Sequence, residues 1–313
     1  MRSSSVDDLY RQGTAAHNAG NYTQAAAIWQ HLLQIDPNFA NVHSQLGVAL
    51  ARQGQYEAAA AAFREAIRLD PDFAHTHTNL GVALIKQGQY EVAKAAFREA
   101  LRLAPDFAPA HDSLGAALAR QGQYEAAEAA FREAIRLAPD FARTHTSLGA
   151  VLAEQGQYEA AEAAYREAIR LDPNFALAHY NLGNAMLSQS QYEAAGAAYR
   201  QAICLDPNLA VAHDNLGATL TGQGEYEAAE AAHREAIRLN PNLAVAYSNL
   251  GVVLGQQGQY EAAEAALREA IRLDPNDAIA HYNLGLSLRP QGRDAEVEAA
   301  FEEARRLGLE GPF

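Results

Sequence analysis

The pattern of apolar positions along the chain predicts short amphipathic helices that come in pairs. In residues 40–73, apolar side chains recur at helical spacing in two runs, Val42, Leu46, Ala49 and Leu50, then Tyr56, Ala59, Phe63, Ala66, Ile67 and Leu69. Gly54 lies between the runs and suits a left-handed helix end. Pro71 cannot continue the second helix, and Asp72 is a residue type that caps the next one. Residues 40–73 therefore predict a helix–turn–helix.

The pair of helices recurs at a fixed interval of 34 residues. The interval is plainest in the prolines, which stand at Pro37, Pro71, Pro105, Pro139, Pro173, Pro207, Pro241 and Pro275. A fixed period of this length predicts an all-α solenoid, in which each repeat buries its apolar face by stacking on its neighbours. We expect one array of nine repeats over residues 6–311, with a disordered tail at 1–5 and a short tail at 312–313. The expected repeats are 6–39, 40–73, 74–107, 108–141, 142–175, 176–209, 210–243, 244–277 and 278–311.

Small residues recur inside both helices of a repeat. Gly47 in the first helix has counterparts at Gly81, Gly115, Gly149, Gly183, Gly217, Gly251 and Gly285. A glycine inside a helix costs roughly 0.5–1 kcal/mol relative to alanine, so a repeated glycine indicates a close approach. Because Ala59 in the second helix is also small and also recurs, we expect two helix backbones to approach each other there.

The third repeat combines these features as Leu80, Gly81, Ala93, Phe97, Ala100 and Pro105. In this order and spacing the residues resemble the tetratricopeptide repeat, and the resemblance extends over nearly the whole chain. It implies antiparallel helix pairs stacked into a right-handed superhelix, with the first helix of each pair lining a concave groove. The end repeats depart from the pattern, with Trp29 in the aromatic position of the first and Pro290 in the turn of the last. Such departures are expected because one face of a terminal repeat meets water.

The residue before Leu-Gly is the strongest candidate for ligand contact. It is an asparagine in five repeats: Asn79, Asn181, Asn215, Asn249 and Asn283. A primary amide both donates and accepts, so a row of asparagines could hold the backbone of an extended peptide whatever its sequence. The row resembles the asparagine ladder in the tetratricopeptide superhelix of O-linked N-acetylglucosamine transferases, without their catalytic domain. The alternative is that these side chains meet solvent or bond within the array.

Two further rows could shape the same surface. The second position of each repeat runs Asn41, His75, Pro109, Arg143, Leu177, Val211, Val245 and Ile279. The apolar members, from Leu177 onward, either form pockets for ligand side chains or pack in the core. A basic set, Arg52, Lys86, Arg120 and Arg143, could contact an acidic ligand. Cations in a last helical turn also favour the helix dipole, which is the alternative for the first three.

The sequence offers little sign of catalysis or of a metal site. Histidine recurs at His43, His77, His111, His145, His179, His213 and His281. Stacked helices lie about 8–10 Å apart, so neighbouring repeats cannot easily share one ion, and we expect these histidines to pack between repeats. No Gly-rich phosphate loop or Gly-x-Ser-x-Gly elbow is present in the sequence. We expect no enzymatic activity, no cofactor and no metal.

Charge and composition narrow the partners. The net charge of −14 disfavours nucleic acid, whose backbone is itself negative. No apolar run is long enough to cross a membrane, and the N-terminal residues do not resemble a signal peptide. The single cysteine, Cys204, fits a reducing compartment. These features favour the cytoplasm.

The sequence therefore predicts a non-catalytic scaffold or adaptor that binds an extended segment of a partner protein in its groove. We expect a monomer. Two alternatives stay open: a structural scaffold that self-assembles end to end through its terminal repeats, and a regulatory subunit of an enzyme encoded elsewhere.

Overall fold

The computed structural model describes residues 4–310, and in that range the protein has α-helices, one short 3₁₀ helix and no strand. The chain divides between Gln155 and Gly156 into two compact parts, which we call the N-terminal part and the C-terminal part and describe separately. The predicted all-α solenoid of helix pairs is confirmed. No helix within residues 4–310 has the length and apolar character needed to cross a membrane.

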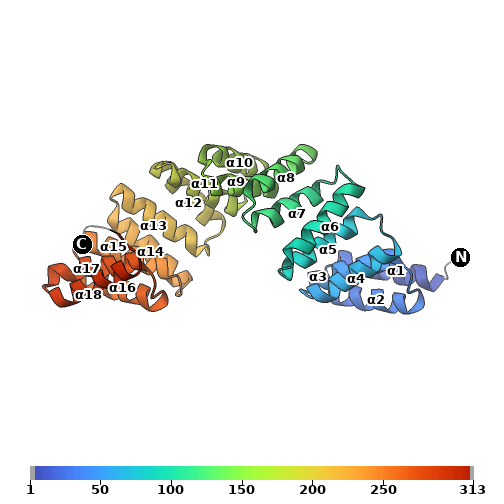
Figure 1. Cartoon of the computed structure of the whole chain (residues 1–313), viewed down its shortest axis with the longest axis horizontal. Coiled ribbons are helices and arrows are strands. Elements are labelled where there is room, and N and C mark those ends of the chain that lie inside the picture. The colour runs from blue at the N-terminus through green and yellow to red at the C-terminus, as the bar shows by residue number, and fades with distance from the viewer. Residues whose placement is uncertain (1–3, 311–313) are drawn as a thin grey trace. The chain divides into compact units, whose positions relative to one another are not determined.

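The helices of the N-terminal part are α1 (Ser4–Asn18), α2 (Tyr22–Ile35), α3 (Ala40–Arg52), α4 (Tyr56–Leu69), α5 (Ala74–Lys86), α6 (Tyr90–Leu103), α7 (Ala108–Ala119), α8 (Tyr124–Leu137) and α9 (Ala142–Glu154). Those of the C-terminal part are α10 (Tyr158–Leu171), α11 (Ala176–Ser188), α12 (Tyr192–Leu205), α13 (Ala210–Gln223), α14 (Tyr226–Leu239), α15 (Ala244–Gln256), α16 (Tyr260–Leu273), α17 (Ala278–Leu288), the 3₁₀ helix η1 (Arg289–Gln291) and α18 (Asp294–Arg306). Within each part, consecutive helices pack side by side (Figure 1).

The N-terminal boundary differs from the expected one. Ser4 and Ser5 belong to α1, whereas a disordered tail was expected at these residues. The first turn of α1 also contains Val6, which is buried, so the helix begins two residues before the expected first repeat. Residues 1–3 and the predicted tail at 312–313 lie outside the described residues.

The turn within each helix pair follows the prediction. Gly54, between α3 and α4, has a φ of +77°, and the Gln55 N–H donates to the Leu50 carbonyl at 3.0 Å. Ser190 takes the same left-handed conformation with a φ of +60°, the one non-glycine residue to do so among residues 4–310. The predicted cap at Asp72 is wrong. Phe73 is the N-cap of α5, and its side chain has no oxygen that could accept a cap hydrogen bond. The Asp72 N–H donates to the Asp70 carboxylate.

The recurring glycine makes room for an aromatic ring. A Cβ atom at Gly47 would lie 2.6 Å from the Phe63 ring, which α4 buries against α3. Gly81 meets Phe97 in the same way. The predicted approach of two helix backbones is therefore wrong, because a side chain of the second helix and not its backbone lies against the glycine. Ala59 is fully buried in the same core cluster.

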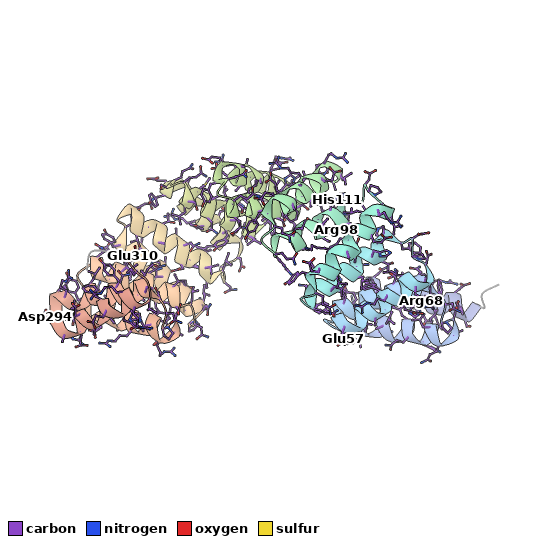
Figure 2. All side chains as sticks on the ribbon, viewed as in Figure 1. Glu57, Arg68, Arg98, His111, Asp294 and Glu310 are labelled. Atoms are coloured by element: carbon purple, nitrogen blue, oxygen red, sulfur yellow. The ribbon has the colours of Figure 1, made fainter. Side chains whose placement is uncertain are left out.

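The second helices expose regular ion pairs. Glu57 and Arg68 mark opposite ends of α4, as the helix dipole favours (Figure 2). Arg68 pairs with Glu65 at 2.6 Å, and the hydrogen bond from Arg68 lowers the pKa of Glu65. Arg132 pairs with Glu128 at 2.8 Å. Exposed pairs of this kind add little stability, so the outer helices present a repetitive, solvated surface.

Candidate functional site

The first helices of the C-terminal repeats form one continuous face. The helices are α11, α13, α15 and α17, and each contacts the next. Each carries an apolar residue and, four positions later, an asparagine, and residues four apart share one side of a helix. The apolar row is Leu177, Val211, Val245 and Ile279, and the asparagine row is Asn181, Asn215, Asn249 and Asn283.

The apolar row is exposed. Its side chains range from 37% exposed at Val211 to 59% exposed at Ile279. Core packing, the alternative left open by the sequence, therefore does not account for these four positions. Exposed aliphatic side chains on adjacent helices leave apolar surface in water, which a ligand could cover.

The asparagine row is half-buried, and its members differ in their partners. The Asn215 Nδ2 donates to Asn184 Oδ1 at 2.9 Å and to the Tyr180 hydroxyl at 3.3 Å. The Asn249 Nδ2 donates to both carboxylate oxygens of Asp214, at 3.3 and 3.2 Å. Asn215 and Asn249 therefore form hydrogen bonds within the array, which is one of the alternatives considered from the sequence. No hydrogen bond of the Asn181 or Asn283 side chain is found within residues 4–310.

A buried polar cluster lies behind Asn249, and it was not predicted from the sequence. His233 occupies the position where most other repeats have a phenylalanine or tyrosine, and its Nδ1 is hydrogen-bonded to Asp214 Oδ1 at 2.7 Å. His233 is fully buried and Asp214 is 3% exposed. The signal present in the sequence is His233 itself, because the other repeats from residue 40 onward have phenylalanine, tyrosine or leucine at that core position. The cluster fixes the Asp214 carboxylate that holds the amide of Asn249.

A second polar cluster supports Asn215. The Tyr199 hydroxyl donates to Asn184 Oδ1 at 2.8 Å, so that oxygen accepts from both Tyr199 and Asn215. Burial raises the pKa of Tyr199, so its hydroxyl keeps its proton and remains a donor. Asn215 is thereby fixed with its Nδ2 turned toward the neighbouring repeat.

In the N-terminal part, Asn79 lines a cavity together with members of the second-position row. The cavity has a volume of about 320 Å³ and includes Asn41, Ser44, Gln45, His75 and Asn79. An equivalent cavity of about 390 Å³ lies two repeats further along, with Pro109, Asp112, Phe141, Arg143 and Thr144 in its wall. In the C-terminal part, Asn283 and Leu286 line a third cavity of about 300 Å³.

The predicted basic set is exposed. Arg52, Lys86, Arg120 and Arg143 make no ion pair that is found within residues 4–310. Arg143 differs from the other three because it lines the cavity that also contains Asp112. The basic set therefore does not form one patch around a single cavity.

The histidine row has a structural role in the turns between repeats. The Nε2 atom of His43 lies 2.8 Å from the Pro37 carbonyl oxygen, and His77 makes the same contact with Pro71 at 2.9 Å. The other histidines of the row repeat this contact six residues back along the chain. Within residues 4–310 there is no cluster of three or more His, Cys, Asp or Glu side chains suited to a metal ion. Cys204 is an exposed free thiol.

Comparison with protein families decides what the helix pairs are. The TPR repeat family matches residues 13–54, 49–88, 151–190, 183–224, 219–258 and 254–292, and a second tetratricopeptide repeat family matches 78–140. The chain belongs to the tetratricopeptide repeat family. Tetratricopeptide repeats support protein–protein interaction. The chain is therefore a protein–protein interaction scaffold in the general sense. A search of curated proteins gives no significant match.

Several solved tetratricopeptide proteins have a similar fold. The APC/C hetero-tetramer Cut9–Hcn1 contains a chain that is 21% identical with a TM-score of 0.66; the match covers 85% of this chain and 52% of that one. This chain thus spans about half the length of that protein. YrrB, described as a TPR protein with an unusual peptide-binding site, is 25% identical with a TM-score of 0.51, covering 60% and 96%. Pseudomonas aeruginosa pilF is 22% identical with a TM-score of 0.60, covering 67% and 96%.

Proposed function

We propose that this tetratricopeptide protein is a non-catalytic scaffold that binds an extended segment of a partner protein across α11, α13, α15 and α17. The observation that carries the proposal is the pairing of two rows on that face. The apolar row offers exposed aliphatic side chains, whose burial by a ligand contributes roughly 25 cal/mol per Å². The asparagine row, one helical turn away, offers amides to the backbone of the same ligand.

The internal hydrogen bonds refine how the amides would act. The Nδ2 groups of Asn215 and Asn249 are engaged within the protein, which leaves Oδ1 of each to accept from a backbone N–H of the ligand. Asn181 and Asn283, at the two ends of the row, can both donate and accept. The segment would be gripped through its backbone, which allows ligands of different sequence.

The N-terminal part has candidate contacts of its own. Asn79 lines a cavity there, and we propose it as a further backbone contact. The exposed cations Arg52, Lys86, Arg120 and Arg143 would contact acidic side chains of the segment. That a similar protein, YrrB, is described as having a peptide-binding site supports a peptide as the ligand class.

The partner is then a protein rather than nucleic acid, in keeping with the net charge of −14. We propose a cytoplasmic location, which suits the single exposed thiol of Cys204. Self-assembly through the terminal repeats and service to a separate enzyme remain the alternatives, and neither gains a specific observation from the fold.

Site-directed photocrosslinking tests the proposal. A benzophenone is attached to Val211→Cys, on the proposed face, in a Cys204→Ser background and exposed to an extract of the native cell. The matched control carries the probe at Gln201→Cys, an exposed position of α12. We expect a defined peptide segment of one partner to crosslink at position 211 and not at 201. Identical products from both positions would contradict the proposal.

A further inference from the structure

The N-terminal part contains two equivalent cavities with different chemistry. Each is walled by the last residue of one repeat, Phe73 in the first cavity and Phe141 in the second, and these rings are 50% and 61% exposed. At the equivalent place between them, Phe107 packs on His75 with ring centroids 4.3 Å apart. Cavities therefore lie beside Phe73 and Phe141, which are two repeats apart, whereas Phe107 between them contacts a neighbouring ring.

The polar group in the wall distinguishes the two cavities. In the first, the hydroxyls of Ser44 and Thr76 lie 3.2 Å apart and satisfy each other. In the second, Asp112 replaces the serine and accepts a hydrogen bond from Thr144. Its Oδ1 atom is buried and has no hydrogen-bond partner within residues 4–310. A buried acceptor without a partner costs free energy, so a donor brought into this cavity would be bound favourably.

The other aspartate at this position of a repeat shows what Asp112 lacks. Asp214 is held by His233 and by the Asn249 amide. The corresponding positions around Asp112 are Phe131, which offers no donor, and Ser147, which is too short to replace an asparagine. The carboxylate of Asp112 therefore stands in an apolar cavity with one internal donor.

Arg143 is near but does not neutralise this carboxylate by contact. It lines the same cavity and remains exposed, and no ion pair joins it to Asp112. Burial raises the pKa of Asp112, while the hydrogen bond from Thr144 and the charge of Arg143 act in the opposite direction. A cation in direct contact with the carboxylate would therefore stabilise its charged form.

We propose that this cavity binds an arginine side chain of the partner segment, an assignment that rests on the proposed function. The guanidinium donates to Asp112, and its flat face and aliphatic stem lie against Phe141, Pro109 and Ala108. The volume of about 390 Å³ is ample for one long side chain. The net charge of −14 attracts basic segments in general, and Asp112 gives one arginine a fixed place. Arg143, displaced toward solvent, would meet an acidic neighbour on the segment.

An NMR titration of the full chain tests the assignment. The probe is acetyl-Gly-Arg-Gly-amide, and its control replaces arginine by citrulline, which has the same shape and no charge. We expect saturable shifts of the Thr144 and Arg143 amides with the arginine probe alone, and no shift at Ser44 or Thr76, which report on the neutral cavity. Asp112→Asn should weaken binding by about tenfold or more, because it removes the charge and keeps the volume.

The variant Arg143→Gln tests whether the cavity prefers a positively charged ligand. The arginine probe should bind this variant more tightly, since a competing cation is removed from the rim. Equal shifts with arginine and citrulline, no effect of Asp112→Asn, or no binding to the wild type would each overturn the assignment. The proposed peptide face of α11, α13, α15 and α17 is tested by other residues, so failure here leaves that proposal standing.

Discussion

Asp112 and Asp214 occupy the same position of their repeats but have different hydrogen-bond partners. These partners determine how far each buried carboxylate lowers the free energy of unfolding. Asp214 is hydrogen-bonded by His233 and Asn249, whereas Asp112 has an unpartnered buried oxygen. Burial raises the pKa of Asp112 above its ordinary 3.8, so the folded protein holds this proton more tightly than the unfolded chain does. Its contribution to stability therefore falls as the pH rises through the raised pKa.

Asp112→Asn should for this reason stabilise the protein near neutral pH. The gain should shrink as the pH falls toward 3.8, where both the folded and the unfolded wild type become protonated. Urea denaturation at a series of pH values measures the difference in free energy of unfolding. Asp140→Asn, at an exposed position, is the control and should show no such trend. A loss of stability in Asp112→Asn at neutral pH would contradict the account.

Ser190 is strained where other repeats have glycine. Its φ of +60° costs an L-residue about 1–2 kcal/mol, part of which glycine loses again through the entropy of the unfolded chain. Ser190→Gly should therefore raise the free energy of unfolding by about 0.5–1 kcal/mol. The reciprocal change, Gly258→Ser, should lower it, because Gly258 has a φ of +75° in the same turn of another repeat. Thermal denaturation of the two variants should move in opposite directions.

The sequence predicted residues whose role repeats and missed those whose role occurs once. Gly54 and Gly47 recur, so their conformational and packing roles could be read from the period. The partner of Gly47 could not, because a close approach does not reveal whether a backbone or a ring causes it. The Asp214–His233 pair depends on two positions 19 residues apart, and only one repeat has an aspartate at the first and a histidine at the second. No period indicates such a pair.

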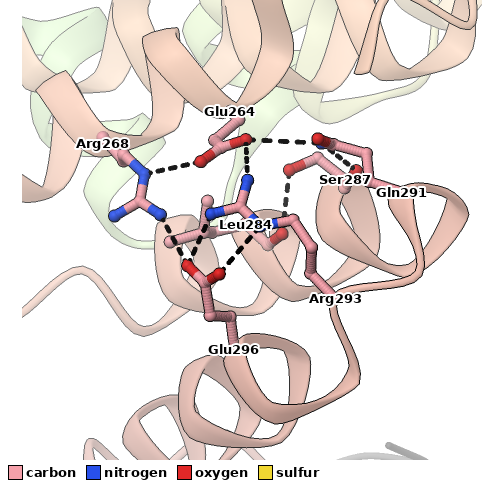
Figure 3. A network of polar contacts seen from close by, with 7 residues as sticks. All are labelled: Glu264, Arg268, Leu284, Ser287, Gln291, Arg293 and Glu296. Atoms are coloured by element: carbon pink, nitrogen blue, oxygen red, sulfur yellow. Dashed lines mark hydrogen bonds and ion pairs between the residues drawn. The ribbon is translucent and has the colours of Figure 1, made fainter. Parts of the chain in front are cut away.

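At the scale of elements, the last helix is joined to its neighbours by a charge network. Arg293 donates to Glu264 of α16 and to Glu296 of α18, both at 2.6 Å, and Arg268 bridges the same two carboxylates (Figure 3). Burial acts against ionisation of Glu264, but the hydrogen bonds from Arg293 and Arg268 lower its pKa overall. Most other repeats have a glutamine at the position of Arg293, as at Gln259. The network is therefore specific to the terminal repeat.

Arg293→Gln should loosen α18 without unfolding the rest. Hydrogen exchange of the α18 amides should become a few-fold faster, because the two carboxylates lose one of the two arginines that bridge them. The difference should narrow in high salt, which screens the wild-type pairs. Arg272→Gln is the control, since Arg272 pairs with Glu269 of its own helix and bridges nothing. Equal exchange rates in Arg293→Gln and wild type would show that Arg293 does not help to hold α18.

Helix positions were the most predictable elements. The apolar period located α3 and α4 because each helix buries one face. Their caps were less predictable. Asp72 was expected to cap α5 and does not, whereas Asp277 caps α17 through the Ile279 and Ala280 N–H groups. The N-cap lies one residue later than Asp72, and a displacement of one residue removes a side-chain cap.

At the scale of the whole molecule, the single array of nine repeats over residues 6–311 stays a prediction. The two compact parts each show the helix pairs that such an array needs. Light scattering should report a monomer of 33.7 kDa at all concentrations if the terminal repeats do not self-associate. A mass that grows with concentration would favour the self-assembling scaffold instead.

The central claim is that the asparagine row holds the backbone of an extended ligand, and calorimetry tests it most directly. The peptide identified by crosslinking at position 211 is titrated into wild type and into Asn181→Ala, Asn283→Ala, the two positions whose amides make no hydrogen bond that is found within residues 4–310. Asn215→Ala, Asn249→Ala is a second pair, and it needs a melting control because it also removes internal bonds.

Losing two ligand hydrogen bonds of about 0.5–1.5 kcal/mol each should weaken binding by roughly tenfold. Helicity and melting of Asn181→Ala, Asn283→Ala should match wild type, and Gln201→Ala on α12 should bind as wild type does. Unchanged affinity in the Asn181, Asn283 pair would contradict the claim and leave the apolar row alone as the binding surface.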